Sequence, residues 1–486
     1  MRNKIFFVIV IVIIIIVFGF LYSDEKNKED VSCRGCNLIM ISLSNVSAKH
    51  MSLYGYERLT TPRLDEWAKD AIVFENAFTQ TSWTLPVAVS LFTSLYPYTH
   101  QITDTHKTGR FVATGNALAR NIVILPEILR DEGYKTAAFT GGLDYNNTFG
   151  HLRGFETLWG ASDEAPDYET AISRMSMGPA LENARSWLEE NRKEKFFLFV
   201  HGYDTHCPIV PPEHVRGTFS TREGKDITVD DTRCVRAFGG PGQEDYEAYY
   251  HLGGDEKIFL TKDDMLYLEE LYDEEILSLD MLVGRFLDEV ENMVGDDTVI
   301  VVFSDHGEMF AKNGRFGRAG RVRGTLYDEA LHIPLVVKTP GHKGGTVEGL
   351  SQIIDVMPTV LDMLELERPA RAQGKSLISL MKGERESVND DVFAGSRFGV
   401  MEERSFFLVY PYQSISESVR SREWKLIHEV IFDEEGGVDE DIYELYDLRD
   451  DPQELNNVFS SKPAVAASMA EVLESWRNAA KQYSGL

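Results

Sequence analysis

Short runs of consecutive apolar residues alternate along the chain with segments whose apolar residues recur at helical spacing. The short runs are typical of strands buried on both faces of a sheet, and they lie at 37–43, 135–140, 196–201, 298–303 and 334–338. Helical segments lie at 62–69, 125–131 and 265–293, and Thr61-Pro62 opens the first of them. This order predicts an α/β fold with a mainly parallel sheet between helices.

The spacing changes from about Asp391 onward. Short strand-like pieces such as Trp424–His428 precede an acidic turn and a last helix at 463–482. We therefore expect an α/β domain at 37–385 and a smaller C-terminal α+β subdomain at 386–486. An N-terminal segment at 1–22 and a linker at 23–36 come before them.

The N-terminal segment contains an uncharged run of Ile, Val and Phe at 5–22. As a helix this run would span roughly 27 Å, enough for the core of a bilayer. Arg2 and Lys4 precede it and acidic residues follow, so the positive-inside rule predicts a membrane anchor with the main domain outside the cytoplasm. A cleaved signal peptide, which would leave a secreted protein, is the alternative.

Charge and cysteine content narrow the class of protein. The chain has 49 basic and 78 acidic residues, a formal net charge of −29, which excludes nucleic acid as a partner. Four cysteines suit an exported protein with room for two disulfides. Cys207 and Cys234 flank a loop that departs from the main fold, and we expect them to pair. Cys33 and Cys36 form a single Cys-x-x-Cys, and a zinc site would need a second one.

The first candidate for chemistry is Asp305-His306, directly after the apolar run at 298–303. Functional groups in an open α/β sheet collect at the carboxyl ends of its strands. A carboxylate next to an imidazole could supply half of a divalent-metal site. An ordinary turn is the alternative, because Asp and Gly are common turn residues.

Four separated segments fit one pattern: the strand and turn at 37–50, Trp83–Pro86, His201–His206, and Asp305 with His306. Further phrases complete it at 51–56 (MSLYGY), 61–65 (TPRLD), 91–97 (LFTSLYP), 326–329 (LYDE), 422–426 (REWKL) and 444–448 (ELYDL). Together they resemble the sulfatase family of the alkaline phosphatase superfamily, from about Asn37 to the final helix. The resemblance implies an alkaline phosphatase-like fold, cleavage of sulfate esters and a divalent metal ion, with calcium the first expectation.

The resemblance places the nucleophile at Thr84, where the family has a Cys or Ser that becomes formylglycine. Threonine cannot be converted in this way, and Ala88 replaces the motif's Arg. Pro86 marks the first turn of a helix through Leu95, so Thr84 would lie at the positive N-terminus, where an alkoxide is favoured. The alternative is that Thr84 only caps this helix.

The expected metal ligands are Asp305, His306, Asn45 and Ser44. The family has one or two Asp residues at the positions of Ser44 and Asn45. Hard divalent cations prefer several charged oxygens, so these neutral residues predict an altered, weak or absent metal site.

The loop from His201 to His206 resembles the family's loop whose later His faces the leaving group. His206 is therefore a candidate general acid, and His201 a second candidate catalytic residue. The alternative for His206 is a hydrogen bond to Asp204 within the loop.

A basic cluster follows Asp305-His306 in an otherwise acidic chain. Arginine forks suit sulfate, phosphate and carboxylate groups, and we expect a flexible loop that holds an anionic substrate through Arg315, Arg318, Arg321 and Arg323, with Lys312 beside them. A solvated face is the alternative.

Two functions remain open from the sequence. The first is a membrane-anchored hydrolase or transferase that acts on sulfate or phosphate esters outside the cell. The second is an inactive member that binds an anionic ligand or partner. The second is favoured because several residues of the family's pattern are replaced in this chain. The replacements are Ser44, Ala88, Val322 before the LYDE phrase, and Gly141-Gly142 where the family has a Lys. The expected partners are a sulfated or phosphorylated small molecule, glycan or lipid headgroup.

Overall fold

The computed structural model describes residues 31–102, 106–108, 112–114, 117–141, 144–145, 147–160, 176–238, 246–251, 257–317, 325–398, 413–433 and 437–483. The predicted anchor at 5–22 lies outside these ranges. Within them, each helix is too short or too polar to cross a bilayer.

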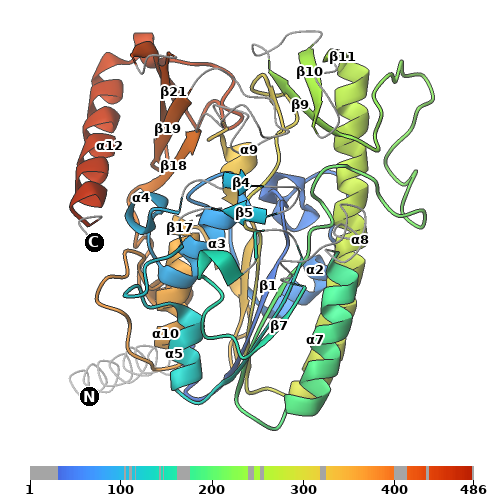
Figure 1. Ribbon diagram of the computed structural model, residues 1–486, viewed down its shortest axis with the longest axis vertical. Coiled ribbons are helices and arrows are strands. Elements are labelled where there is room, and N and C mark those ends of the chain that lie inside the picture. The colour runs from blue at the N-terminus through green and yellow to red at the C-terminus, as the bar shows by residue number, and fades with distance from the viewer. Residues whose placement is uncertain are drawn as a thin grey trace, which may run out of the picture.

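The centre of the molecule is an eight-stranded sheet in the order β16-β2-β15-β12-β1-β8-β6-β7 (Figure 1). Five adjacent strands run parallel: β12 (Thr298–Phe303), β1 (Asn37–Ser42), β8 (Phe196–His201), β6 (Lys135–Thr140) and β7 (Thr157–Trp159). The prediction of a mainly parallel sheet is therefore confirmed. The remaining strands are β15 (Leu335–Lys338), antiparallel to β12, then β2 (Ile72–Phe74) and β16 (Gly345–Val347).

Helices cover both faces of this sheet, as Figure 1 shows. Alternate residues of β1 serve the two faces: Leu38 and Met40 join one apolar core, whereas Ile39 and Ile41 join the other. The first core contains α3 (Thr84–Thr93), α5 (Leu125–Asp131) and α10 (Val356–Met363), and the second contains α2 (Pro62–Trp67), α7 (Met177–Asn191) and α8 (Lys262–Val294). The strand ends are thereby fixed between two packed layers.

The C-terminal part is an antiparallel sheet with a helix against it (Figure 1). Its strands are β18 (Val392–Phe398), β19 (Gln413–Arg420), β20 (Trp424–Phe432) and β21 (Val438–Asp447), and its helix is α12 (Pro463–Tyr483). The predicted α+β character of this part is confirmed. One short helix, α9 (Asp328–Leu331), shares a core with it that includes Ile427 and Tyr446.

An insertion between β8 and α8 forms a second antiparallel sheet. It consists of β9 (Cys234–Phe238), β10 (Tyr246–His251) and β11 (Lys257–Leu260), joined by β13 (Arg315–Phe316). The predicted disulfide between Cys207 and Cys234 ties its first strand to the loop after β8, and Cys33 pairs with Cys36. Minor elements are β3 (Ala77–Phe78), β14 (His332–Ile333), β17 (Ser351–Gln352), β4 (His106–Thr108), β5 (Val112–Thr114), α4 (Pro97–His100) and α11 (Ile378–Met381).

Candidate active site

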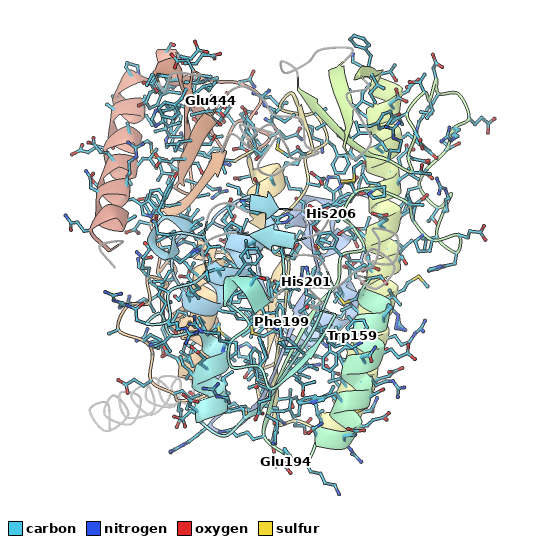
Figure 2. The ribbon with its side chains drawn as sticks, viewed as in Figure 1. Trp159, Glu194, Phe199, His201, His206 and Glu444 are labelled. Atoms are coloured by element: carbon cyan, nitrogen blue, oxygen red, sulfur yellow. A yellow bond between two sulfur atoms is a disulfide. The ribbon has the colours of Figure 1, made fainter. Side chains whose placement is uncertain are left out.

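The candidate site lies where three neighbouring parallel strands end. The register pairs Ser42, the last residue of β1, with His201 of β8 and with Phe303 of β12. The residues that follow these strands therefore meet at one edge of the sheet. Figure 2 shows His201 and His206 near the centre of the molecule, far from Glu194, which precedes β8.

Asp305 is buried and holds the loops after β12 and β1 together. Its Oδ1 atom accepts hydrogen bonds from the backbone N–H of Asn45 at 2.8 Å and of His306 at 3.0 Å. Its Oδ2 atom lies 3.2 Å from His306 Nε2. Burial opposes ionisation, but His306, His201 and the Asn45 N–H outweigh it and hold the pKa of Asp305 well below its ordinary value. Asp305 is therefore a carboxylate.

The tautomer of His306 follows from its backbone contact. The ring Nδ1 lies 3.0 Å from the carbonyl oxygen of Gly307, which can only accept, so Nδ1 carries a proton and donates. In the neutral ring this leaves Nε2 as an acceptor. That atom faces Thr84 Oγ1 at 3.2 Å, so the predicted convergence of Thr84 with the 305–306 pair is present.

Thr84 is the first residue of α3, and Trp83 is the N-cap. The alternative prediction, that Thr84 only caps the helix, is therefore wrong. The helix also ends at Thr93, two residues earlier than predicted, because Ser94 adopts a left-handed conformation with φ of 57°. The Thr84 hydroxyl is buried beside the first turn of α3, where unpaired N–H groups favour negative charge.

Ser44 and Asn45 occupy the turn after β1, and both are buried. The Ser44 hydroxyl has no hydrogen-bond partner within the described ranges. Asn45, with φ of 60°, donates from Nδ2 to the carbonyl oxygen of Thr205 at 2.7 Å and to Glu308 Oε2 at 3.2 Å. Asn45 therefore connects the loops that follow β1, β8 and β12.

The donor atoms at this edge fit a borderline cation better than calcium. Asp305 Oδ2 has no hydrogen-bond partner in the described part of the chain. It lies 3.2 Å from His306 Nε2, which in turn faces Thr84 Oγ1. One carboxylate, one imidazole and hydroxyls suit zinc or manganese, whereas calcium takes six to eight oxygens, usually from several carboxylates. No group of three His, Cys, Asp or Glu residues that could hold a metal occurs among the described residues. Calcium stays a prediction.

His201 is a buried neutral ring at the same edge. Its Nδ1 lies 3.0 Å from Ser42 Oγ, and its ring packs 4.4 Å from that of Tyr145. Burial lowers the pKa of His201 to about 4, although Asp305 opposes this shift. The catalytic role of His201 stays a prediction.

His206 is half-buried and stacks on the ring of Tyr203, with centroids 4.2 Å apart. Its Nδ1 donates to the carbonyl oxygen of Cys207 at 2.9 Å. Asp204 accepts from the backbone N–H of Met177 at 2.5 Å, and burial raises its pKa to about 6. The role of His206 as general acid stays a prediction.

The basic cluster is only partly described. Lys312 pairs with Glu269 of α8 at 3.1 Å and with Glu329 of α9 at 3.5 Å, so it serves the fold. Arg315 belongs to β13, and its Nη1 donates to the carbonyl oxygen of Gly314 at 3.2 Å. The predicted anion-binding residues Arg318, Arg321 and Arg323 lie outside the described ranges, and their role stays a prediction.

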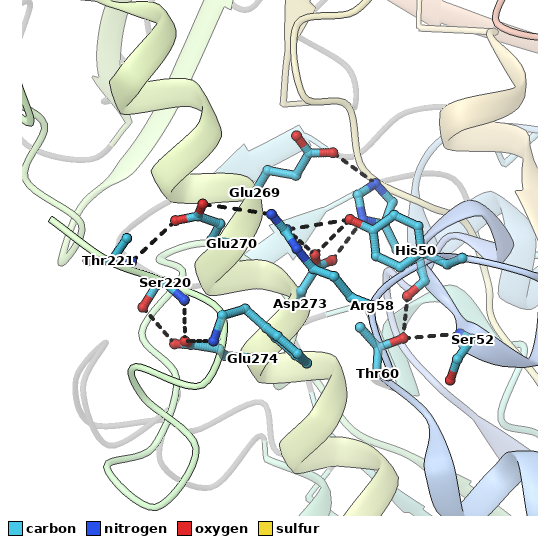
Figure 3. Close-up of polar contacts among 12 residues, drawn as sticks. His50, Ser52, Arg58, Thr60, Ser220, Thr221, Glu269, Glu270, Asp273 and Glu274 are labelled. Carbon is cyan, nitrogen blue, oxygen red and sulfur yellow. Dashed lines mark hydrogen bonds and ion pairs between the residues drawn. The ribbon is translucent and has the colours of Figure 1, made fainter. Parts of the chain in front are cut away.

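Sequence reasoning missed an acidic stripe on α8, drawn in Figure 3. Asp273 lies 2.8 Å from His50 Nδ1 and 2.6 Å from Arg58 Nη1, which fixes the segment after β1. The signal was present as four carboxylates within two turns of one helix, at 269, 270, 273 and 274. Such a run more often faces solvent, and its partners, which lie both after β1 and in the insertion, become visible only in the folded chain.

One member of this stripe holds the insertion through its backbone. Glu274 Oε1 accepts from the N–H groups of Gly217, Phe219 and Ser220 at 2.9, 2.9 and 2.7 Å. Figure 3 shows Glu274 beside Ser220. A carboxylate with three N–H donors makes strong, charge-assisted bonds. The insertion is therefore anchored to α8 next to the loop that carries His206.

Comparisons with known proteins agree with this architecture. The sulfatase family model matches residues 36–366, and a model for the C-terminal part of N-sulphoglucosamine sulphohydrolase matches residues 322–479. The chain is 22% identical to the N-acetylglucosamine-6-O-sulfatase of Bacteroides thetaiotaomicron, over 92% of this chain and 86% of that protein. It is 24% identical to the multifunctional alkaline phosphatase superfamily protein PehA of Trinickia caryophylli, over 86% of this chain and 90% of that protein.

Solved structures give the same result for the fold. The phosphonate monoester hydrolase of Agrobacterium radiobacter superposes with a TM-score of 0.68 at 22% identity, over 92% of this chain and 96% of that chain. A protein in complex with its substrate D-glucosamine-2-N,6-O-disulfate superposes with a TM-score of 0.66 at 18% identity, over 92% and 98%. The alkaline phosphatase-like fold is thereby confirmed.

Proposed function

Because the chain belongs to the sulfatase family of the alkaline phosphatase superfamily, we propose that it is a sulfatase-like hydrolase in which Thr84 attacks the sulfur or phosphorus of an ester. The supporting observation is the contact of Thr84 Oγ1 with His306 Nε2 at 3.2 Å, beside the Asp305 carboxylate. A hydroxyl at the start of α3 also lies where N–H groups favour the anionic oxygens of the ester.

The surrounding residues divide the chemistry. Asp305 keeps its charge and fixes the turn after β1 through the Asn45 N–H. The cation that Asp305 and His306 would bind supplies polarisation of the ester oxygens. His306 Nε2 has one lone pair, so it serves either as a cation ligand or as the acceptor of the Thr84 proton. His206 would give a proton to the alcohol as its bond to sulfur or phosphorus breaks, and a water molecule would then release sulfate or phosphate from Thr84.

A second candidate function is binding without turnover. The observation in its favour is the neutral Ser44 at a position where the family has Asp. A neutral hydroxyl in place of a charged ligand weakens a cation site. The ligand would again be an anionic group at the start of α3.

We also place this function outside the cytoplasm, with 5–22 as a membrane anchor or, alternatively, a cleaved signal. Support comes from two disulfides, which persist in oxidising compartments. Relatives include an N-acetylglucosamine-6-O-sulfatase and an ulvan-active sulfatase, so a sulfated glycan is the first substrate class to test. Phosphorylated small molecules and lipid headgroups come next.

The test is hydrolysis of 4-nitrophenyl sulfate and 4-nitrophenyl phosphate by the full chain, with zinc, manganese, calcium or EDTA. Thr84→Val should lower kcat/KM at least about 1,000-fold, because it removes the nucleophile. Thr84→Ser should keep most of the activity, and Thr93→Val at the other end of α3 should keep all of it. Loss of activity in EDTA is the result expected if His306 is a cation ligand, and activity that survives EDTA is the result expected if His306 accepts the Thr84 proton.

Absence of turnover with every cation, together with anion binding that Thr84→Val leaves unchanged, would establish the second candidate function instead.

A further inference from the structure

The C-terminal sheet places a fully buried lysine against the short helix α9. Lys425 of β20 is 0% exposed, and its Nζ lies 2.7 Å from Asp328 Oδ1 and 2.7 Å from Glu454 Oε1. Arg420 Nε donates to the other oxygen of Asp328 at 3.0 Å. Two cations and two carboxylates therefore meet at the first residue of α9.

This cluster fixes the backbone of α9 as well as a side chain. Glu454 Oε2 accepts from the backbone N–H of Asp328 at 2.6 Å. Burial opposes the ionisation of Asp328, but Arg420 and Lys425 outweigh it and hold its pKa far below the ordinary value. A buried ion cluster adds little net stability compared with apolar residues, but it specifies one geometry. The cluster thus holds α9 in one position.

From α9 the contacts continue to the candidate active site. The backbone N–H of Gly307 donates to the carbonyl oxygen of Ala330 in α9 at 2.8 Å. A Cβ atom at Gly307 would lie 2.4 Å from the carbonyl oxygen of Glu329, so only glycine allows this approach. The carbonyl oxygen of Gly307 then accepts from His306 Nδ1, and His306 Nε2 faces Thr84.

We propose that Lys425 is a positioning residue for His306, acting through Asp328, α9 and Gly307. The C-terminal subdomain would thereby complete the active site without contributing a group that touches the substrate. The catalytic consequence rests on the proposed function, whereas the positioning itself does not. A displaced α9 turns the imidazole away from Thr84, which lowers kcat and leaves substrate binding nearly unchanged.

The test uses the full chain and a charge-balanced double variant, Lys425→Met with Glu454→Gln, which leaves the Arg420–Asp328 pair intact. The matched control is Arg477→Met with Glu417→Gln, an ion pair between α12 and β19 of the same subdomain. Hydrogen exchange of the peptide 304–310 reports the Gly307 N–H without any need for catalysis. Steady-state kinetics report kcat and KM.

In the Lys425 double variant we expect the amide hydrogens of the 304–310 peptide to exchange at least about 10-fold faster. We also expect kcat to fall at least about 10-fold and KM to change less than about 3-fold. The control should leave all three quantities near wild type. If the double variant does not fold, Asp328→Asn should give the same changes at smaller size.

Unchanged exchange in a folded Lys425 variant would overturn the proposal, and so would equal acceleration in the control, which would indicate general loosening. Faster exchange in the Lys425 variant alone supports the positioning even if the wild-type chain turns over no ester. The missing turnover would then count only against the proposed function.

Discussion

The two halves of the candidate site are built differently. The half after β12 is charged and closely held, since Asp305 accepts two backbone N–H groups and His306 is fixed by Gly307. The half after β1 is neutral, and the Ser44 hydroxyl has no hydrogen-bond partner within the described ranges. The turn after β1 keeps its conformation because Asn45 supplies the contacts between loops. The turn after β1 can therefore carry neutral residues and still keep its conformation in the fold.

The largest expected effect comes from comparing one substitution in each half of the candidate site by its effect on kcat/KM. Asp305→Asn should lower kcat/KM at least about 100-fold, because an amide in place of Oδ2 would donate to His306 Nε2 and remove it from Thr84. Ser44→Ala should change it less than about 3-fold, since it removes an unpartnered hydroxyl. Kinetics on the same aryl esters check both variants. Equal losses would mean that the neutral half contributes as much as the charged half.

The next effect comes from returning a charge to the neutral half. Ser44→Asp should tighten manganese or zinc binding about 10-fold or more, because a second carboxylate joins Asp305. Isothermal titration calorimetry measures the change. Ser44→Asn is the control of similar size without charge, and equal affinities for the two variants would show that charge at position 44 is irrelevant.

A smaller effect tests how closely the charged half is held. Gly307→Ala should destabilise the protein by about 2 kcal/mol, because its Cβ would lie 2.4 Å from the Glu329 carbonyl oxygen and 2.8 Å from Ser47 Cβ. Urea unfolding measures this loss. Gly178→Ala in α7 has open space around it and should cost nothing. Equal stability of the two variants would contradict a close approach of α9.

The smallest effect concerns a buried neutral imidazole near His201. His151 is 0% exposed, neither ring nitrogen has a hydrogen-bond partner within the described chain, and it packs against Tyr145. Burial lowers its pKa from 6.5 to about 3. Between these values only the unfolded state binds the proton, so stability falls as the pH falls, by at most about 1.4 kcal/mol per pH unit.

His151→Phe should therefore stabilise the protein increasingly as the pH falls below 6.5. Thermal unfolding at pH 7.5, 6.5 and 5.5, that is, at the reference pKa and about one unit on either side of it, measures the trend. A constant difference between variant and wild type would exclude this source of acid sensitivity.

The sequence predicted the parts of the fold that depend on local patterns. The runs that became β1, β8 and β12 are short and apolar, and parallel strands bring their ends together. The resemblance to the sulfatase family, rather than the strand pattern, placed Thr84 in the same site as His306. The Cys207–Cys234 disulfide was also predicted. Contacts between distant charged side chains were not predictable in this way. Lys425 and Asp328 are separated by 97 positions, and nothing in either local pattern indicates the pair.

Strand direction and helix caps were also not predictable from local sequence patterns. The antiparallel course of β15 against β12 depends on where the chain re-enters the sheet. Thr84 has the residue type of a cap, yet the helix begins one residue earlier than a Thr84 cap would require, with Trp83 as the N-cap. Lys312 looked like a substrate-binding cation until the packing of α8 supplied Glu269.

The anchoring of the insertion by Glu274 bears on how this protein could change its specificity. The carboxylate accepts hydrogen bonds from the main-chain N–H groups of residues 217, 219 and 220, so these bonds do not depend on the side chains at those positions. Every amino acid except proline offers that group. The segment could thus exchange its residues freely over evolutionary time, while its attachment to the long helix endured.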